Sequence, residues 1–202
     1  MGITLRTAGP SPFGRKIQIA AAVLGLSDDI AVEATDTMDP EDSIRGQNPL
    51  GKIPALILDD GRVLYDSRVI IEYLDSLDGA GRVIPTDGDA RFEALTTQAL
   101  ADGILDAAIL IVYEGRFRAD VEPHQPWLGH QRGKIERALD ALEAAPPPID
   151  PVTIGAIGAA CALGYLDFRK QVDWRARNPG LIGWLDTFAA AVPAFAETRP
   201  DA

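Results

Sequence analysis

Two hydrophobic periodicities divide this chain of 202 residues. Apolar and polar residues alternate over residues 3–7, and short apolar runs follow at 30–34, 55–58 and 63–65, as in β-strands. Apolar residues with helical spacing lie between these runs, at 17–24 and 69–77. From residue 92 onward, the apolar stretches have helical spacing. The pattern therefore predicts a mixed α/β region followed by an all-helical region.

Cap and turn residues indicate where these elements begin and end. Ser11 stands at an N-cap position with Pro12 at the first helical position, a favoured helix start, and Gly25 ends that helix. Residues 35–47 are polar and predict a loop with a short helix. The composition of 79–89, with three glycines and Pro85, is that of a linker. We therefore predict domains at 1–78 and 90–202 joined by a linker at 79–89, with later helices near 92–116, 127–144, 153–169 and 179–191.

Charge and composition limit the possible partners. The net charge of −11 argues against nucleic acid and anionic membrane surfaces, and the apolar run at 107–113 is too short to cross a bilayer. The single cysteine, Cys161, excludes an internal disulfide. His124 and His130 lack acidic or cysteine neighbours at ligand spacing, so we expect no metal site. The composition and the absence of a signal-peptide pattern predict a cytoplasmic protein.

The most informative segment comprises residues 48–54, which read NPLGKIP, and the pair Asp66-Ser67 that follows a predicted hairpin. A proline at the head of a strand can leave the backbone of Ile53 free to pair with a ligand. Asp66-Ser67 opens a helix, whose N-terminal N–H groups and dipole attract a carboxylate. Together they predict a site for an extended, peptide-like anion, although Asp66-Ser67 alone would be an ordinary helix cap.

These elements, with further motifs in the same order along the whole chain, resemble the glutathione transferase family. The further motifs are Ser11-Pro12-Phe13-Gly14-Arg15-Lys16, residues 162–169 (ALGYLDFR), Trp174-Arg175, Pro179-x-Leu181-x-x-Trp184 and Pro193-x-Phe195. The resemblance implies a thioredoxin-like N-terminal domain that binds glutathione, followed by a helical bundle. It also implies an enzyme of detoxification. Its members usually form homodimers, in which the first domain contacts the partner's long helix, near residues 99–106 here.

Family members stabilise the thiolate of glutathione with a Tyr, Ser or Cys at the end of the first strand. No tyrosine precedes Tyr65 and the only cysteine lies in the helical region, which leaves Thr7 and Ser11. Ser11 occupies the position that resembles the serine-type members, so we predict that its hydroxyl donates to the thiolate. The alternative is that Ser11 only caps the helix.

The resemblance assigns the other glutathione contacts. Ile53 and Pro54 would bind through the backbone, with a cis bond between them, and Ser67 and Asp66 would hold the γ-glutamyl carboxylate and ammonium. Lys52 would bind the glycyl carboxylate, or else be a solvated lysine. Arg15, Lys16 and Arg68 are further cations that could offset the acidity of the chain, although at least two of the four cations would be solvated surface charges.

Phe13, Tyr113 and Phe117 are the candidates for the electrophile pocket between the domains, with core packing as the alternative for each. The small hydrophobic electrophile itself is not indicated. Asp167, Arg169 and Arg175 are expected to pair within the helical domain. Two other functions stay open at this point. One is glutathione-dependent isomerisation or dehalogenation, and the other is non-catalytic ligand binding or protein interaction on the same fold.

Overall fold

A computed structural model describes residues 2–77 and 79–200 of the chain. Contacts group Met1–Asp87 with Val192–Ala202 and set Gly88–Ala191 apart as a second unit. The first unit contains a mixed sheet with helices and the second is wholly helical, which confirms the predicted fold class. The domain boundaries at 78 and 90 stay predictions.

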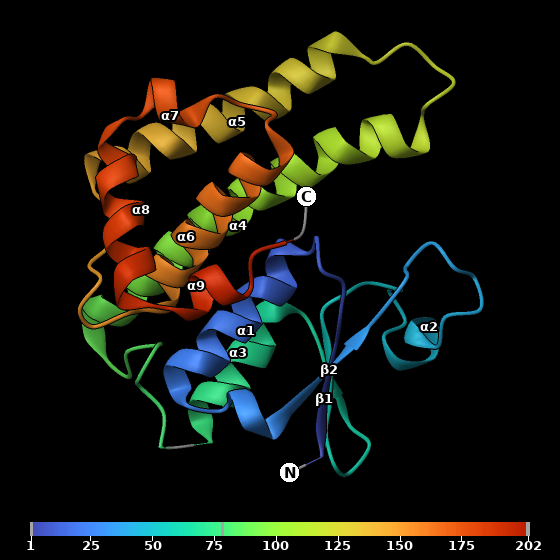
Figure 1. Cartoon of the computed structure of the whole chain (residues 1–202), viewed down its shortest axis with the longest axis vertical. Coiled ribbons are helices and arrows are strands. Elements are labelled where there is room, and N and C mark those ends of the chain that lie inside the picture. The colour runs from blue at the N-terminus through green and yellow to red at the C-terminus, as the bar shows by residue number, and fades with distance from the viewer. Residues whose placement is uncertain (1, 78, 201–202) are drawn as a thin grey trace. The chain divides into compact units, whose positions relative to one another are not determined.

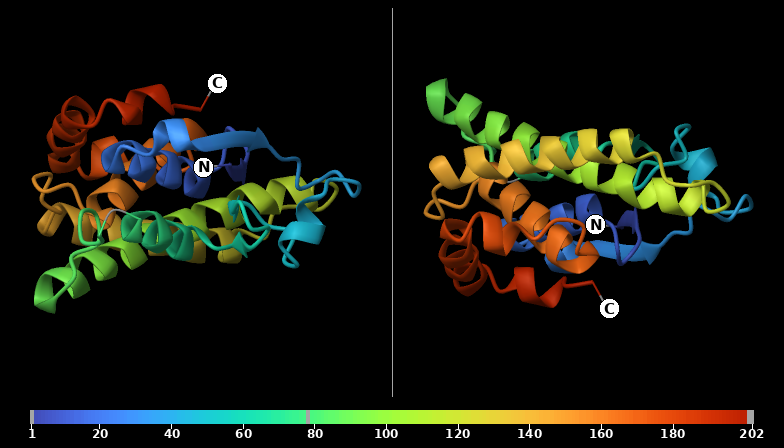
Figure 2. Two further views of the ribbon diagram at one scale, coloured as in Figure 1. Left: turned by 90° about the horizontal axis from the view of Figure 1, so that it is seen from below. Right: turned by 90° about the horizontal axis from the view of Figure 1, so that it is seen from above.

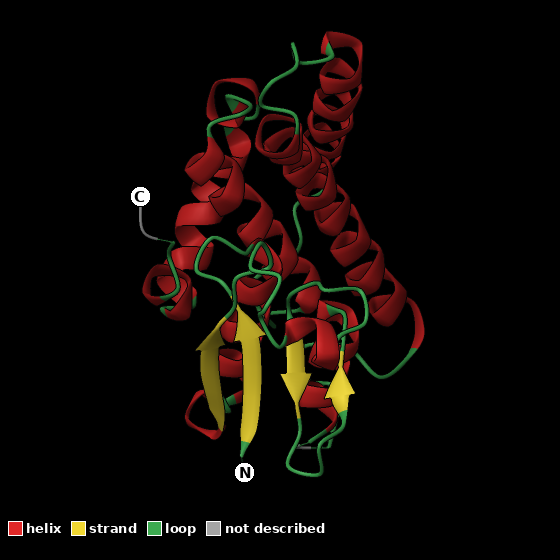
Figure 3. Ribbon diagram, turned by 90° about the vertical axis from the view of Figure 1, so that its right-hand side faces the viewer, coloured by secondary structure: helices red, strands yellow, loops and turns green. Residues whose placement is uncertain are grey.

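The first unit is built on a four-stranded sheet of order β2-β1-β3-β4 (Figure 3). β1 (Ile3–Thr7) runs parallel to β2 (Ile30–Ala34) and antiparallel to β3 (Ala55–Ile57), which pairs antiparallel with β4 (Val63–Leu64). Helices α1 (Pro12–Leu24) and α3 (Ser67–Ser76) lie on one face, and the short α2 (Ile44–Gln47) lies on the other (Figure 1). This is the thioredoxin-like arrangement that the family resemblance implies.

The residues after α3 are held by one buried carboxylate. Asp75, which is 3% exposed, accepts hydrogen bonds from the backbone N–H groups of four successive residues, 81–84, at 2.9–3.4 Å. Arg82 in turn donates to the carbonyl oxygens of Val23 and Leu24 at the end of α1. The stretch whose composition predicts a linker is therefore packed into the first unit over these residues.

The helical unit contains α4 (Gly88–Phe117), α5 (Gln125–Ala144), α6 (Ile154–Arg169), α7 (Trp174–Arg177) and α8 (Gly180–Ala191). α4 and α5 run antiparallel side by side in both views of Figure 2. α6 is almost entirely buried, including Cys161, and its glycines allow close packing on α4. A Cβ at Gly155 would lie 2.9 Å from Thr97 Cβ.

The sequence pattern does not predict three short elements. They are a 3-10 turn (Ser27–Asp29) and α9 (Ala194–Glu197) in the first unit, and α7 in the helical unit. Each has only three or four residues, which is too few to show a helical period. The longest helix, α4, is long and apolar enough to cross a membrane by length and composition alone. However, its buried side chains pack against α5 and α6, including Ala101, Ile104, Leu105 and Ala108.

Carboxylates of α5 hold α7 and the start of α8. Arg177 donates to both oxygens of Asp140, at 3.0 and 2.7 Å, and Asn178 donates to Asp140 and Glu143. Glu143 also accepts the backbone N–H of Gly180 at 2.7 Å, which places a negative charge at the N-terminus of α8. The hydrogen bonds from Arg177 and Asn178 lower the pKa of Asp140 below its ordinary value.

Acid is therefore expected to remove the contribution of Asp140 to stability. A carboxyl whose folded pKa is lowered stabilises the fold above its unfolded pKa, near ~3.9, and the contribution disappears as the pH falls through the folded pKa. The difference in Tm between the wild type and Asp140→Asn should be constant from about pH 5 to 7, because an ordinary aspartate is fully ionised there. It should shrink below about pH 4, where the carboxyl becomes protonated. The exposed loop variant Asp120→Asn is the control and should follow the wild type throughout. A difference that persists at low pH would contradict the charged role of Asp140.

Candidate functional site

The predicted glutathione residues gather at one edge of the sheet in the first unit. In the β1–β3 pair, Arg6 lies opposite Ala55, so the next position along brings Pro54 opposite Thr7. In the β3–β4 pair, Leu56 lies opposite Leu64, so the same register brings Pro54 opposite Asp66. With about 4.8 Å between neighbouring strands, this edge is about 10 Å from β1 to β4. Three extended residues span about the same length. The edge therefore has the dimensions of a tripeptide site.

The segment leading to Pro54 is shaped by Asn48, which is only 2% exposed. Its Oδ1 accepts the backbone N–H of Leu50 at 3.0 Å, and its Nδ2 donates to the carbonyl oxygen of Lys52 at 2.8 Å. Gly51, at φ 59°, completes this turn. The Ile53–Pro54 peptide bond is cis, as predicted, and the Tyr65–Asp66 bond is cis as well. Asn48 thus controls the backbone from which Lys52 and Ile53 are presented.

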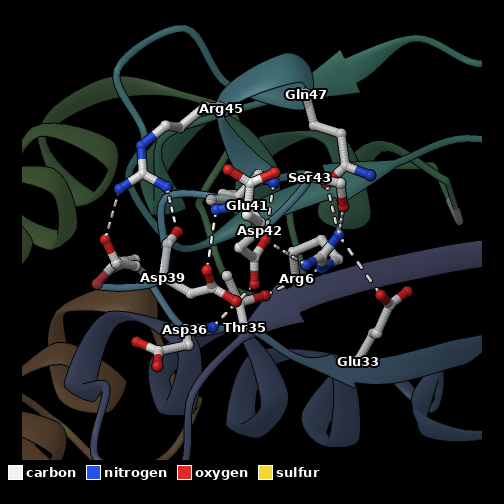
Figure 4. Close-up of polar contacts among 12 residues, drawn as sticks. Arg6, Glu33, Thr35, Asp36, Asp39, Glu41, Asp42, Ser43, Arg45 and Gln47 are labelled. Atoms are coloured by element: carbon white, nitrogen blue, oxygen red, sulfur yellow. Dashed lines mark hydrogen bonds and ion pairs between the residues drawn. The ribbon is translucent and has the colours of Figure 1, made fainter.

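The loop before Asn48 is tied to the sheet by Arg6, which is 3% exposed (Figure 4). The guanidinium donates at 2.8–2.9 Å to four side chains and lies 3.5 Å from a fifth; the partners are Thr35, Asp42, Ser43, Gln47 and Glu33. Asp42 also accepts the backbone N–H of Ile44, and this bond is the first cause of its lowered pKa, to which Arg6 adds. Arg6 therefore anchors the loop that leads into the site.

Ser11 is the N-cap of α1, as predicted. Its Oγ accepts the backbone N–H of Gly14 at 3.2 Å, and the residue is partly exposed. A serine hydroxyl has one proton to donate in addition to its acceptor lone pairs. Capping uses Ser11 only as an acceptor, so the proton stays available to a thiolate. The cap and the proposed catalytic contact are therefore compatible rather than exclusive.

Thr7, the other residue left by elimination, is placed differently. It is 3% exposed, and its Oγ1 has no hydrogen-bond partner within the described part of the chain. The side chain packs against the backbone of Gly14, where an added Cβ would lie 2.8 Å from Thr7 Cβ and closer still to Oγ1. The threonine hydroxyl points into this contact, which favours Ser11 as the thiolate donor.

At the far end of the edge, Asp66 is the N-cap of α3. Its Oδ1 accepts the backbone N–H of Arg68 at 3.0 Å, and the residue is exposed, whereas Ser67 is 2% exposed. The helix N-terminus predicted at this position is therefore present. The contacts assigned to Asp66 and Ser67 with the γ-glutamyl group stay predictions.

The four candidate cations divide by burial. Arg15 is 5% exposed, donates to the carbonyl oxygen of Phe195 and to Thr198, and stacks 4.2 Å from the Phe195 ring centroid. It fastens α9 to α1. Lys16 is fully buried, with its Nζ 5.4 Å from the centroid of the Phe13 ring. Lys52 and Arg68 are exposed beside the site, so they are the better candidates to attract an anion.

The aromatic candidates come from both units. Phe13 lies in the first turn of α1 and is partly exposed. In the helical unit, Tyr113 and Phe117 form an edge-to-face pair with centroids 5.1 Å apart, and they are 41% and 57% exposed. Core packing therefore does not explain these two rings. Among residues 2–77 and 79–200, no three His, Cys, Asp or Glu side chains come together as metal ligands.

Comparison with known proteins gives consistent matches. The model of the glutathione S-transferase N-terminal domain matches residues 10–77, and that of the C-terminal domain matches residues 125–187. The "Uncharacterized GST-like protein YibF" of Escherichia coli is 33% identical over 195 residues, covering 94% of this chain and 95% of that protein.

Solved structures match over the full length. A glutathione transferase family member from Pseudomonas fluorescens Pf-5 with bound glutathione is 42% identical, covers 100% of both chains and has a TM-score of 0.91. A second Pf-5 structure, with bound S-(propanoic acid)-glutathione, is 43% identical with a TM-score of 0.87 over 99% of this chain and 100% of that one. A protein from Methylobacillus flagellatus KT with glutathione bound is 34% identical with a TM-score of 0.89, over 99% and 100%.

Proposed function

This chain belongs to the glutathione S-transferase family, and we propose that it is a glutathione transferase in which Ser11 stabilises the thiolate of bound glutathione. The observation that carries this proposal is the hydrogen bonding of Ser11. Its oxygen accepts the backbone N–H of Gly14, its proton has no acceptor among the described residues, and it stands at the positive end of α1. That combination is what a thiolate requires.

Glutathione would lie along the sheet edge. The backbone of Ile53, at the head of β3, would pair with the cysteinyl residue, and Lys52 would bind the glycyl carboxylate. Asp66 and Ser67 would hold the γ-glutamyl end at the start of α3. The relatives from Pseudomonas fluorescens and Methylobacillus flagellatus, whose structures contain glutathione, support binding of the same ligand here.

Thiolate stabilisation matters because a thiol with a pKa near ~8.5 is mostly protonated at neutral pH, and only the thiolate is a good nucleophile. A hydrogen bond to a charged group is worth about 1.5–3 kcal/mol, which corresponds to a pKa lower by about one to two units. In the reaction, sulfur bonds to the electrophilic carbon, the leaving group departs with the bonding electrons, and the thiol proton goes to solvent.

We propose further that Phe13, Tyr113 and Phe117 contribute to electrophile binding and that the protein works as a cytoplasmic homodimer. Exposed rings offer flat apolar surface to a small hydrophobic substrate. For the dimer, Ala99, Leu100 and Gly103 of α4 border a hollow of about 360 Å³ with Lys134, Arg137 and Ala138 of α5. The small residues on this face leave room for a partner to approach.

Asn48 provides the test of the binding half of the proposal. In Asn48→Ala, the carbonyl of Lys52 and the N–H of Leu50 lose their partners, at a cost of about 1–3 kcal/mol, so the loop should relax. A loss of about 1–3 kcal/mol corresponds to about tenfold in affinity, so we expect the KM for glutathione to rise by about that factor. The kcat should be nearly unchanged. Asn48→Asp keeps the acceptor for Leu50 but buries a carboxylate against the carbonyl oxygen of Lys52, so its effect should be at least as large as that of Asn48→Ala.

Calorimetric titration of glutathione, with conjugation assayed in parallel, measures both quantities. Binding to the wild type that is weakened in Asn48→Ala would support the proposed site. An unchanged glutathione affinity in Asn48→Ala, in a variant that stays folded, would contradict it.

A further inference from the structure

The ends of α4 and α6 carry a cluster of arginine and aromatic side chains within the helical unit, which we call the arginine–aromatic cluster. Arg169 Cζ lies 4.5 Å from the ring centroid of Phe168 and 5.5 Å from that of Tyr165. Arg116 Cζ lies 5.7 Å from the ring centroid of Tyr113, which meets Phe117 edge to face. The members of the cluster are Tyr113, Arg116, Phe117, Tyr165, Phe168 and Arg169.

The cluster joins side chains of two helices that pack against each other, α4 and α6. Burial is the first cause that raises the pKa of Tyr165, and Arg169 lowers it through its hydrogen bond and charge. Tyr113 and Arg116 of α4 also act on the same hydroxyl, the first raising and the second lowering its pKa. Gly155 of α6 lies against Thr97 of α4, and Gly158 lies against Ala101, so the two helices run in the same direction. Arg116 and Arg169 therefore lie at the same, C-terminal end of the pair.

The nearby carboxylates are already engaged by other arginines. Glu114 lies 3.4 Å from Arg118 and accepts the backbone N–H of His124. Asp167 accepts two hydrogen bonds from Arg175, at 3.0 and 2.7 Å, and one from Trp174. The expected pairing of Asp167 with Arg175 is thus confirmed, but the expected inclusion of Arg169 is wrong.

Among the residues that the structure describes, neither Arg116 nor Arg169 has a carboxylate within ion-pair distance. This is notable in a chain with 30 acidic and 19 basic residues. Arg169 uses its Nε to donate to the Tyr165 hydroxyl at 3.3 Å, which leaves both terminal nitrogens as donors. A planar guanidinium held against rings is preorganised for bidentate recognition of a carboxylate. Exposed aromatic faces beside it offer a surface for a flat apolar group.

We propose that the arginine–aromatic cluster binds the carboxylate of planar, apolar electrophiles, so that the substrates are aromatic or conjugated carboxylic acids rather than neutral molecules. The inference rests on the proposed function for the reaction, but the binding it describes needs neither glutathione nor Ser11. The carboxylate pairs with Arg116 and Arg169, and the ring of the ligand packs against Tyr113 and Phe117.

The binding test compares 2-naphthoate with 2-naphthamide, which has a similar shape but no charge, by calorimetry in the absence of glutathione. The wild type should bind naphthoate at least tenfold more tightly than naphthamide. Arg116→Gln/Arg169→Gln should lose that preference, and Arg116→Gln alone should reduce it. Arg132→Gln, which removes one positive charge from α5 outside the cluster, is the matched control and should behave as wild type. Equal affinities for the two ligands in the wild type would overturn the proposal.

A kinetic experiment tests whether the arginine–aromatic cluster selects the electrophile in the reaction. 4-Chloro-3-nitrobenzoate and 4-chloro-3-nitrobenzamide both react by forming a C–S bond and releasing chloride. The double variant should raise the KM for the benzoate at least tenfold, with kcat and the values for the benzamide little changed. If the double variant raises both KM values equally, the cluster has no role in charge selection. Loss of thiol activation with an intact naphthoate preference would instead contradict the function of Ser11 alone.

Discussion

Replacing Ser11 by alanine is expected to lower kcat/KM for conjugation at neutral pH about tenfold to a hundredfold, because one hydrogen bond to the thiolate is lost. The affinity for glutathione should change far less, since the other predicted contacts lie at Lys52–Pro54 and Asp66-Ser67. Steady-state kinetics with glutathione varied, together with calorimetric binding, separates the two effects. The same variant should lose about 1 kcal/mol of stability with the helix cap.

The substitution Ser11→Asp separates capping from catalysis. An aspartate at the N-cap can still accept the backbone N–H of Gly14, so the variant should keep the stability of the wild type. It has no proton to donate, and its negative charge opposes a neighbouring thiolate. Its activity should therefore be at least as low as that of Ser11→Ala. Activity close to that of the wild type in Ser11→Asp would show that Ser11 is only a cap.

Replacing Gly14 by alanine is expected to destabilise the protein by about 3 kcal/mol or more, because the new methyl group would overlap a packed side chain. An added Cβ would lie 2.8 Å from Thr7 Cβ and nearer still to Thr7 Oγ1. Both Gly14 and Thr7 are buried at the junction of α1 and β1, so the overlap cannot be relieved by rotation into solvent. Equilibrium unfolding in urea measures the loss.

A second substitution tests the cause. Thr7→Ala removes a hydroxyl that has no partner among the described residues, so alone it should cost little, and combined with Gly14→Ala it should recover part of the loss. Gly129→Ala is the control, because no atom outside the helix's own backbone lies within 4 Å of a Cβ at this α5 position. It should be neutral or stabilising by about 1 kcal/mol. Additive losses in the double variant would contradict the proposed overlap.

The sequence predicts elements well where the pattern repeats over several turns. The helices near 127–144 and 153–169 are found at Gln125–Ala144 and Ile154–Arg169, because each carries enough apolar periods to define a buried face. The caps Ser11 and Asp66 are also found as predicted. The prediction of a cis Ile53–Pro54 bond, which the structure confirms, rested on the family resemblance, because backbone propensity favours trans.

Buried polar side chains are harder to predict, because their partners are distant in sequence. Arg6 alternates with apolar neighbours in β1 and would be expected to face solvent, yet it is buried and binds side chains 29–41 residues away. Asn48 is visible in the NPLGKIP motif, but its two backbone contacts appear only in the folded turn. Arg169 lacks the predicted carboxylate because Asp167 accepts hydrogen bonds from Arg175 of α7 instead. α7 has only four residues, so the sequence pattern does not predict it.

The most direct measurement of thiol activation is the ultraviolet absorbance of the glutathione thiolate, titrated against pH with and without the protein. The expected result is a bound-state thiol pKa about one to two units below the free value of ~8.5, reversed in Ser11→Ala. Saturated binding with an unshifted pKa would contradict the role of Ser11 and favour a protein that binds glutathione without activating it.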